Sequence, residues 1–250
     1  TNAGRGGTGN LVWQAGQVLA KALLAMEEAP CGGSGDAAPV DAPAAALPPG
    51  VEPLLGRGGA VAHPGGGGTV LELGAGTGEL AILLARAGWR NIVATDGDMA
   101  VVKNMKYNVN VNKLGHAVRC VRWDWADPAP NGVALDSVDL CIGSDLVYYD
   151  RAHADLAALL ARVLAAARPG ARALLMSRLR IAHRDSGGQV VHRPTPDGSG
   201  FEGCSLQRFM EEELPAEGLC ARVVQPIPGG GDEGDPSFFF YEVKLAAEPQ

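Results

Sequence analysis

The sequence predicts a doubly wound α/β fold, with a mostly parallel sheet and helices on both of its faces. Three observations lead to this prediction. From residue 69 onward, short apolar and β-branched stretches alternate with longer stretches of helical periodicity. A glycine-rich turn joins the first strand-like stretch to the first helix of this series. The chain ends in two strand-like stretches with no helical pattern between them.

Each element is expected from its local pattern. The expected strands are Thr69–Leu73, Asn91–Thr95, Ala117–Arg122, Ser137–Gly143, Ala171–Ser177, Leu219–Gln225 and Ser237–Leu245. The expected helices are Leu11–Met26, Gly78–Ala87, Asp98–Asn112, Ala152–Ala167 and Ser205–Leu214. The helix over Ala152–Ala167 has the clearest pattern, because its leucines and valines recur on one stripe and Pro169-Gly170 follows it.

Composition divides the chain into three parts. Residues 1–27 form an N-terminal helical segment, and residues 28–68 are dominated by Ala, Pro and Gly, so we expect a flexible low-complexity insertion there. Residues 69–246 hold all the alternating elements and form the main domain. Within it, the polar stretch Arg184–Gly203 and the glycine-rich stretch Gly229–Pro236 are expected to be loops.

Charge and cysteine usage narrow the function classes. The 250 residues carry a net charge of -7, with Lys and Arg spread singly, which argues against nucleic acid or an anionic membrane as partner. The five cysteines are scattered and the histidines lack a metal-binding spacing, so we expect neither a disulfide framework nor a metal site. We expect a cytoplasmic monomer. Because the sequence begins with Thr1, nuclear and organellar locations stay open.

The most informative motif is the run from Glu72 to Gly78, an acid followed by glycines at alternate positions. Glycines between a strand and a helix let a ligand approach backbone N–H groups at the helix N-terminus. A dinucleotide fingerprint starting at Gly74 requires glycine at position 79, where this chain has Glu79. The motif therefore predicts a nucleoside site of another kind, and a purely structural turn is the alternative.

A second acid, Asp96, ends the next expected strand about twenty residues after the glycines, where a carboxylate can bind both hydroxyls of a ribose. The alternative role for Asp96 is a helix cap. Asp98 is equally able to cap the helix that follows, so capping does not require Asp96. The two acids and the glycines together predict a nucleoside-binding βαβ unit.

A third group of polar residues, Ser144, Asp145, Tyr148 and Tyr149, follows the expected strand Ser137–Gly143. In an open α/β sheet, ligands bind beyond the carboxyl ends of the strands. An acid three residues before a tyrosine therefore places a carboxylate and a phenol at that edge. Alternatively, Asp145 is a helix cap and the tyrosines are packing aromatics.

These motifs resemble a known family. The pattern E-x-G-x-G-x-G resembles motif I of class I S-adenosylmethionine (SAM) methyltransferases. Asp145-x-x-Tyr148 resembles the signature of methyltransferase family 16, whose members mostly methylate lysines of non-histone proteins. Gly9–Gly16 and Arg122–Pro128 resemble that family's tryptophan-containing segments. The resemblance implies a Rossmann-like sheet of about seven strands whose last strand is antiparallel.

The resemblance also assigns residues. It implies that Gly74, Ala75 and Gly76 contact the methionine end of the cofactor, with Glu72 near its amine. Asp96 is then expected to bind the ribose, and Asp124 and Trp125 to lie by the adenine. Ser144 is expected beside the sulfonium, and Trp13 over the cofactor. Asp145 and Tyr148 are the implied catalytic residues, one holding the acceptor amine and the other lining the transfer channel. For each tryptophan, an ordinary packing role is the alternative.

The expected activity is methyl transfer from SAM, with S-adenosyl-L-homocysteine as product, to a protein lysine. Three alternatives stay open. The acceptor is a small-molecule amine, or a protein histidine or arginine, or the chain is a SAM-binding scaffold without activity. The long insertion and the Arg184–Gly203 loop leave the identity of the substrate undetermined.

Overall fold

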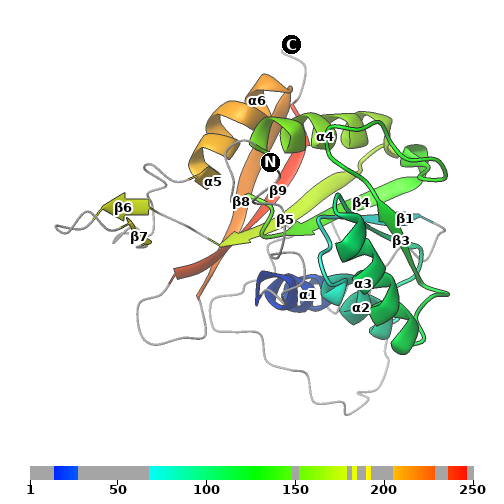
Figure 1. Cartoon of the computed structure of the whole chain (residues 1–250). Helices are drawn as coiled ribbons and strands as arrows, with labels where there is room; N and C mark the ends of the chain where they lie inside the picture. Colours follow the sequence, from blue (N-terminus) through cyan, green and yellow to red (C-terminus); the bar gives the residue numbers. More distant parts are fainter. Residues whose placement is uncertain are drawn as a thin grey trace, which may run out of the picture.

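The computed structural model describes residues 14–27, 68–147, 152–178, 182–184, 190–192, 205–228 and 236–246. Its main feature is a seven-stranded sheet in the order β3-β2-β1-β4-β5-β9-β8 (Figure 1). The strands are β1 (Thr69–Leu73), β2 (Ile92–Asp96), β3 (Val118–Arg122), β4 (Val138–Ser144), β5 (Arg172–Arg178), β8 (Leu219–Pro228) and β9 (Pro236–Leu245). The helices are α1 (Gln14–Glu27), α2 (Glu79–Arg86), α3 (Met99–Val111), η2 (Leu135–Ser137), α4 (His153–Ala166), α5 (Ser205–Arg208), η4 (Phe209–Glu213) and α6 (Leu214–Ala216).

The strand directions confirm the predicted fold class. β1 pairs in parallel with β2 and β4, and the parallel pairing continues outward to β3 and β5. β9 is antiparallel to both of its neighbours, β5 and β8. The last strand therefore runs against the rest of the sheet, as predicted, and it lies inside the sheet.

The two faces of the sheet carry separate helical layers. α1, α2 and α3 cover one face, and α4, α5 and α6 lie over the other (Figure 1). Alternate strand residues point to opposite faces, so Val70 joins the apolar cluster under α1–α3 while Leu71 joins the cluster under α4–α6. This alternation gives the domain two apolar cores divided by the sheet.

The structure refines two expectations in the second half of the chain. The stretch expected as a loop from Arg184 to Gly203 includes β7 (Val190–His192), which pairs antiparallel with β6 (Ala182–Arg184) at its start. The stretch Ser205–Leu214 is helical as expected, with a π-helical turn, η4, at its centre. Most of the 28–68 insertion and of the Gly229–Pro236 stretch lies outside the described residues.

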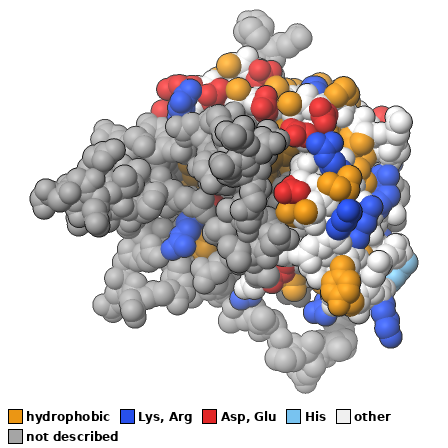
Figure 2. All heavy atoms as spheres, viewed as in Figure 1, with side chains coloured by type: hydrophobic (Ala, Val, Ile, Leu, Met, Phe, Trp, Pro, Cys, Tyr) orange, Lys and Arg blue, Asp and Glu red, His pale blue; other side chains and the backbone are white. Residues whose placement is uncertain are grey.

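Basic residues that are separated in the sequence lie together on one side of the surface. Five exposed cations lie on α3, on the turn after it and on β3, namely Lys103, Lys106, Lys113, Arg119 and Arg122. Figure 2 shows Lys and Arg side chains collected over this side of the molecule. Arg122 is partly neutralised by Asp124 and Asp127, at 3.9 and 3.7 Å. In the described part of the chain, no helix is long and apolar enough to cross a membrane.

Candidate functional site

The glycine motif forms a tight turn between β1 and α2. Gly74, Gly76 and Gly78 have φ angles of 58°, 54° and 81°, a left-handed conformation that other residues adopt at a steric cost. A Cβ atom on Gly74 would lie 2.5 Å from Cδ2 of Leu146, so this position also lacks room for a side chain. The turn is held to β2 by the bond from Ala75 N–H to the Thr95 carbonyl, at 2.8 Å.

Helix α3 supports this turn from a distance in sequence. Asn108 Nδ2 donates to the carbonyl of Thr77 at 2.9 Å, and the Met105 side chain would lie 2.7 Å from a Cβ on Gly78. Sequence reasoning missed both residues. The signal for Asn108 was weak, since a polar residue in a helix is usually solvated.

Glu72 is the most perturbed acid of the site. Its side chain is 1% exposed, and its Oε2 atom has no hydrogen-bond partner among the described residues. Burial raises the pKa of Glu72 to about 8, against the opposing effect of a hydrogen bond from the backbone of Ala81, and the charge of Asp96 raises it further. A buried acid with one unused oxygen is suited to a cationic ligand group, which favours its ionised form.

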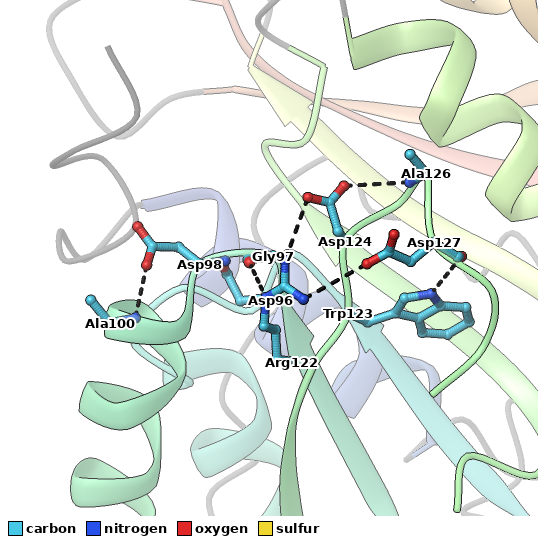
Figure 3. Close-up of polar contacts among 9 residues, drawn as sticks. All are labelled: Asp96, Gly97, Asp98, Ala100, Arg122, Trp123, Asp124, Ala126 and Asp127. Atoms are coloured by element: carbon cyan, nitrogen blue, oxygen red, sulfur yellow. Dashed lines mark hydrogen bonds and ion pairs between the residues drawn. The ribbon is translucent and has the colours of Figure 1, made fainter. Parts of the chain in front are cut away.

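Asp96 is the last residue of β2 (Figure 3). Its two carboxylate oxygens accept from Gly76 N–H at 3.1 Å and from Asp98 N–H at 3.0 Å. The pKa of Asp96 is raised by burial, and these backbone hydrogen bonds offset only part of that rise. Asp98 caps α3 by accepting from Ala100 N–H at 2.7 Å, so the structure confirms that capping does not require Asp96.

The segment after β3 contains two tryptophans with different surroundings. Trp123 is buried, and its Nε1 donates to the Asp127 carbonyl at 3.1 Å (Figure 3). Trp125 is half-buried, and its ring would lie 3.6 Å from a Cβ on Gly74. Asp124 lies beside Gly97, with its Cα 3.6 Å from the position of a Cβ there. The fold thus brings Asp124 and Trp125 to the same edge as the glycine turn.

The end of β4 forms the other wall of the site. Asp145 is 8% exposed and has a φ of 56°, a left-handed backbone that is uncommon for a residue with a side chain. Its N–H donates to the Met176 carbonyl at 2.6 Å, and its Oδ1 accepts from Arg178 N–H at 3.3 Å. The next residue, Leu146, packs against Gly74, so this wall adjoins the glycine turn.

Helix α1 closes over Ser144. The Ser144 hydroxyl would lie 3.4 Å from a Cβ on Gly16, which shows how closely the helix approaches β4. Sequence reasoning quoted Gly16 as the end of a motif and gave it no role. Gln17 on the same helix donates to Glu79 at 2.9 Å, tying α1 to the start of α2.

The remaining predicted site residues, Trp13, Tyr148 and Tyr149, lie outside the described residues, so their roles stay predictions. The other predicted residues share one edge of the sheet, at the carboxyl ends of β1, β2, β3 and β4. Across the described ranges, no group of three or more His, Cys, Asp or Glu side chains is arranged to hold a metal ion.

Comparison with known proteins gives a family. Residues 1–186 match the family model described as lysine methyltransferase. A stretch of 110 residues is 38% identical to ribosomal protein L11 methyltransferase of Bradyrhizobium diazoefficiens, covering 44% of this chain and 35% of that protein. Another, of 105 residues, is 31% identical to protein N-terminal and lysine N-methyltransferase efm7 of Aspergillus fumigatus, covering 38% and 40%. The chain thus spans well under half the length of both curated relatives.

Solved structures resemble the fold more distantly. The glycopeptide N-methyltransferase MtfA, complexed with S-adenosyl-L-homocysteine, is 19% identical with a TM-score of 0.49, covering 71% of this chain and 81% of that chain. A likeness at this level says nothing about the acceptor. The family match covers most of the chain, so this protein belongs to the lysine methyltransferase family.

Proposed function

We propose that this methyltransferase transfers the methyl group of SAM to the ε-amine of a lysine in a non-histone protein. The observation that carries the proposal is the Asp145 carboxylate, which is nearly buried and is held by the main chain of β5 at the same edge as the glycine turn. An ionised carboxylate only accepts hydrogen bonds, so it suits an amine that donates an N–H to it while receiving the methyl group.

The described residues of the cofactor half fit SAM on two counts. The three glycines form a turn without side chains between β1 and α2, and Glu72 has an unused buried oxygen for the amine of the methionine end. We propose that Asp96 binds the ribose with its remaining lone pairs, because each of its oxygens already accepts one backbone N–H. Asp124 and Trp125 are proposed to flank the adenine, and Trp13 to cover the cofactor.

The acceptor half has to orient a neutral amine. When bound, SAM supplies an electrophilic methyl group on a sulfonium. A free lysine has a pKa of about 10.4, so the site must favour the unprotonated form or admit it after the proton is lost to water. Asp145 accepts one N–H of the amine and thereby directs the nitrogen lone pair, and such positioning supplies several kcal/mol. Ser144 is proposed to form the floor, and Tyr148 the wall of the channel.

A protein acceptor is favoured by the curated relatives, both of which are named as methyltransferases of proteins. The net charge of -7 also accommodates a basic acceptor segment. We propose that the enzyme acts as a cytoplasmic monomer on a protein partner, without nucleic acid or membrane.

The test is a transfer experiment with tritiated SAM and a cell lysate, followed by mass spectrometry of the labelled peptide. We expect the label on a lysine of one protein band. Asp145→Ala should lower the transfer rate by at least about 100-fold while leaving the Kd for SAM, measured by calorimetry, within about twofold. Label that is confined to small molecules, or that lies on histidine or arginine, would overturn the lysine assignment. Wild-type transfer by Asp145→Ala would remove Asp145 from the mechanism.

A further inference from the structure

Two hydroxyl groups interrupt the apolar layer between the sheet and α4. Ser177 on β5 and Tyr241 on β9 are both fully buried, and their oxygens lie 3.0 Å apart. Their neighbours on this face of the two strands are apolar, including Leu175 and Phe239. Burying polar groups in such a layer costs free energy, which the hydrogen bond between them offsets only in part.

The pair lies directly beside the residues that hold Asp145. The Met176 carbonyl accepts from Asp145 N–H, and Arg178 N–H donates to the Asp145 carboxylate. Ser177 is the residue between these two backbone groups. Its hydroxyl bonds Tyr241, which lies diagonally across on β9, so the Ser177–Tyr241 bond ties the end of β5 to the neighbouring strand.

The pair is also linked to Asp145 through charge. Burial raises the pKa of Tyr241, the Ser177 bond lowers it, and the negative charge of Asp145 raises it further, so the carboxylate is electrostatically coupled to the phenol.

Asp145 needs such support because its backbone is strained. A residue with a side chain persists at a φ of 56° only when its surroundings fix it there. We propose that Ser177 and Tyr241 are positioning residues, which fix backbone 176–178 and through it the Asp145 carboxylate for methyl transfer. This inference rests on the proposed role of Asp145.

The test compares single-oxygen deletions. Tyr241→Phe and Ser177→Ala are assayed for tritium transfer from SAM to the protein fraction of the lysate, across a range of SAM concentrations. We expect the maximal rate to fall by about tenfold in each variant, with the KM for SAM within about twofold. Because the two hydroxyls act as one unit, the maximal rate of the double variant should lie within about twofold of that of either single variant.

The matched control is Ser137→Ala. Ser137 and Thr69 form another hydroxyl pair between strand ends, at 2.8 Å, at the opposite edge of the same sheet. This variant should lower the melting temperature as the others do and leave the maximal rate unchanged. If Tyr241→Phe or Ser177→Ala, shown to be folded by circular dichroism, keeps the wild-type rate, the inference is overturned. If Asp145→Ala keeps that rate instead, the proposed function fails, so the two failures are distinguishable.

Discussion

The two edges of the sheet differ in how they treat polar groups and backbone strain. At the amino ends of the strands, Thr69 pairs with Ser137, and Asp139 forms an ion pair with Arg168 at 3.3 Å. At the carboxyl ends, Glu72 keeps an oxygen without a partner among the described residues. The left-handed Asp145 lies at this edge as well.

Left-handed residues occur near both edges, so their conformation alone does not mark a site. Gly170, in the turn before β5, has a φ of 85° and has no atom within 4 Å of the position of a Cβ. Gly74 combines the same conformation with a crowded neighbour. A buried acid with an unsatisfied oxygen and a close approach at a glycine together distinguish the functional edge from a structural one.

The largest effect is expected from Gly74→Ala. The new Cβ meets Leu146 and is also strained by the left-handed backbone, so the turn must shift. We expect the Kd for SAM, measured by calorimetry, to rise by at least about 100-fold, since overpacking costs about 1–3 kcal/mol and left-handed strain about 1–2 kcal/mol. Gly170→Ala is the control and should leave the Kd unchanged. Equal losses in both variants would contradict the comparison.

Asp96→Ala should have the next largest effect. It removes the acceptor of two backbone N–H groups and the proposed ribose ligand. Hydrogen bonds to charged groups contribute about 1.5–3 kcal/mol, so we expect the Kd for SAM to rise by about ten- to a hundredfold. The matched variant Asp139→Ala breaks a half-exposed ion pair at the other edge and should cost at most about 1 kcal/mol of stability. An unchanged Kd in Asp96→Ala would count against the ribose role.

The sequence predicted what is local at the functional edge. The glycine turn, Asp96 and the end of β4 each belong to one strand and the residues just after it, and parallel strands bring such ends together. The support of the site was not predictable in this way. Asn108 holds a carbonyl 31 residues earlier, and Ser177 bonds a tyrosine 64 residues later. No local pattern records contacts of that separation.

The second half of the chain was also predicted less well. A stretch rich in Gly and Ser hid the β6–β7 hairpin, because short strands without an apolar alternation resemble a loop. The π-helical turn in η4 has no distinct composition, so no sequence pattern indicated it.

The raised pKa of Glu72 predicts a pH dependence of both stability and SAM binding. Its folded pKa of about 8 lies above its ordinary value of 4.5, so its contribution to stability is fully present below pH 4.5 and is lost as the pH rises through 8. The melting temperature of the ligand-free protein should therefore fall between pH 6 and pH 8, measured by scanning calorimetry. Affinity for SAM should change in the opposite direction, by about fivefold between pH 7 and pH 8, because the ionised carboxylate binds the amine.

Glu72→Gln is the control for the pH dependence of both the melting temperature and the affinity for SAM. It keeps the shape of the side chain and removes the titration, while the amine of SAM still titrates in both proteins. The difference between the two pH profiles isolates Glu72. Parallel profiles for the variant and the wild type would show that Glu72 does not titrate in this range.

The smallest effect is expected from Ser137→Ala, at the amino edge. Loss of the hydroxyl pair with Thr69 should lower the free energy of unfolding by about 1 kcal/mol, or about 2–4 °C in melting temperature. Denaturant titration measures this change, and transfer activity should stay at the wild-type level. A loss of transfer activity in Ser137→Ala would contradict the assignment of function to the carboxyl ends of the strands alone.

The position of β9 imposes an order on assembly of the domain. β8 leaves the ribosome before β9, yet β9 is its strand neighbour and separates it from β5. Until β9 is made, the edge of β5 is open and β8 has no strand to join within the described sheet. The sheet is therefore completed only after β9 is made, and pairing between segments that lie far apart in the sequence, such as β5 and β9, is slow in general.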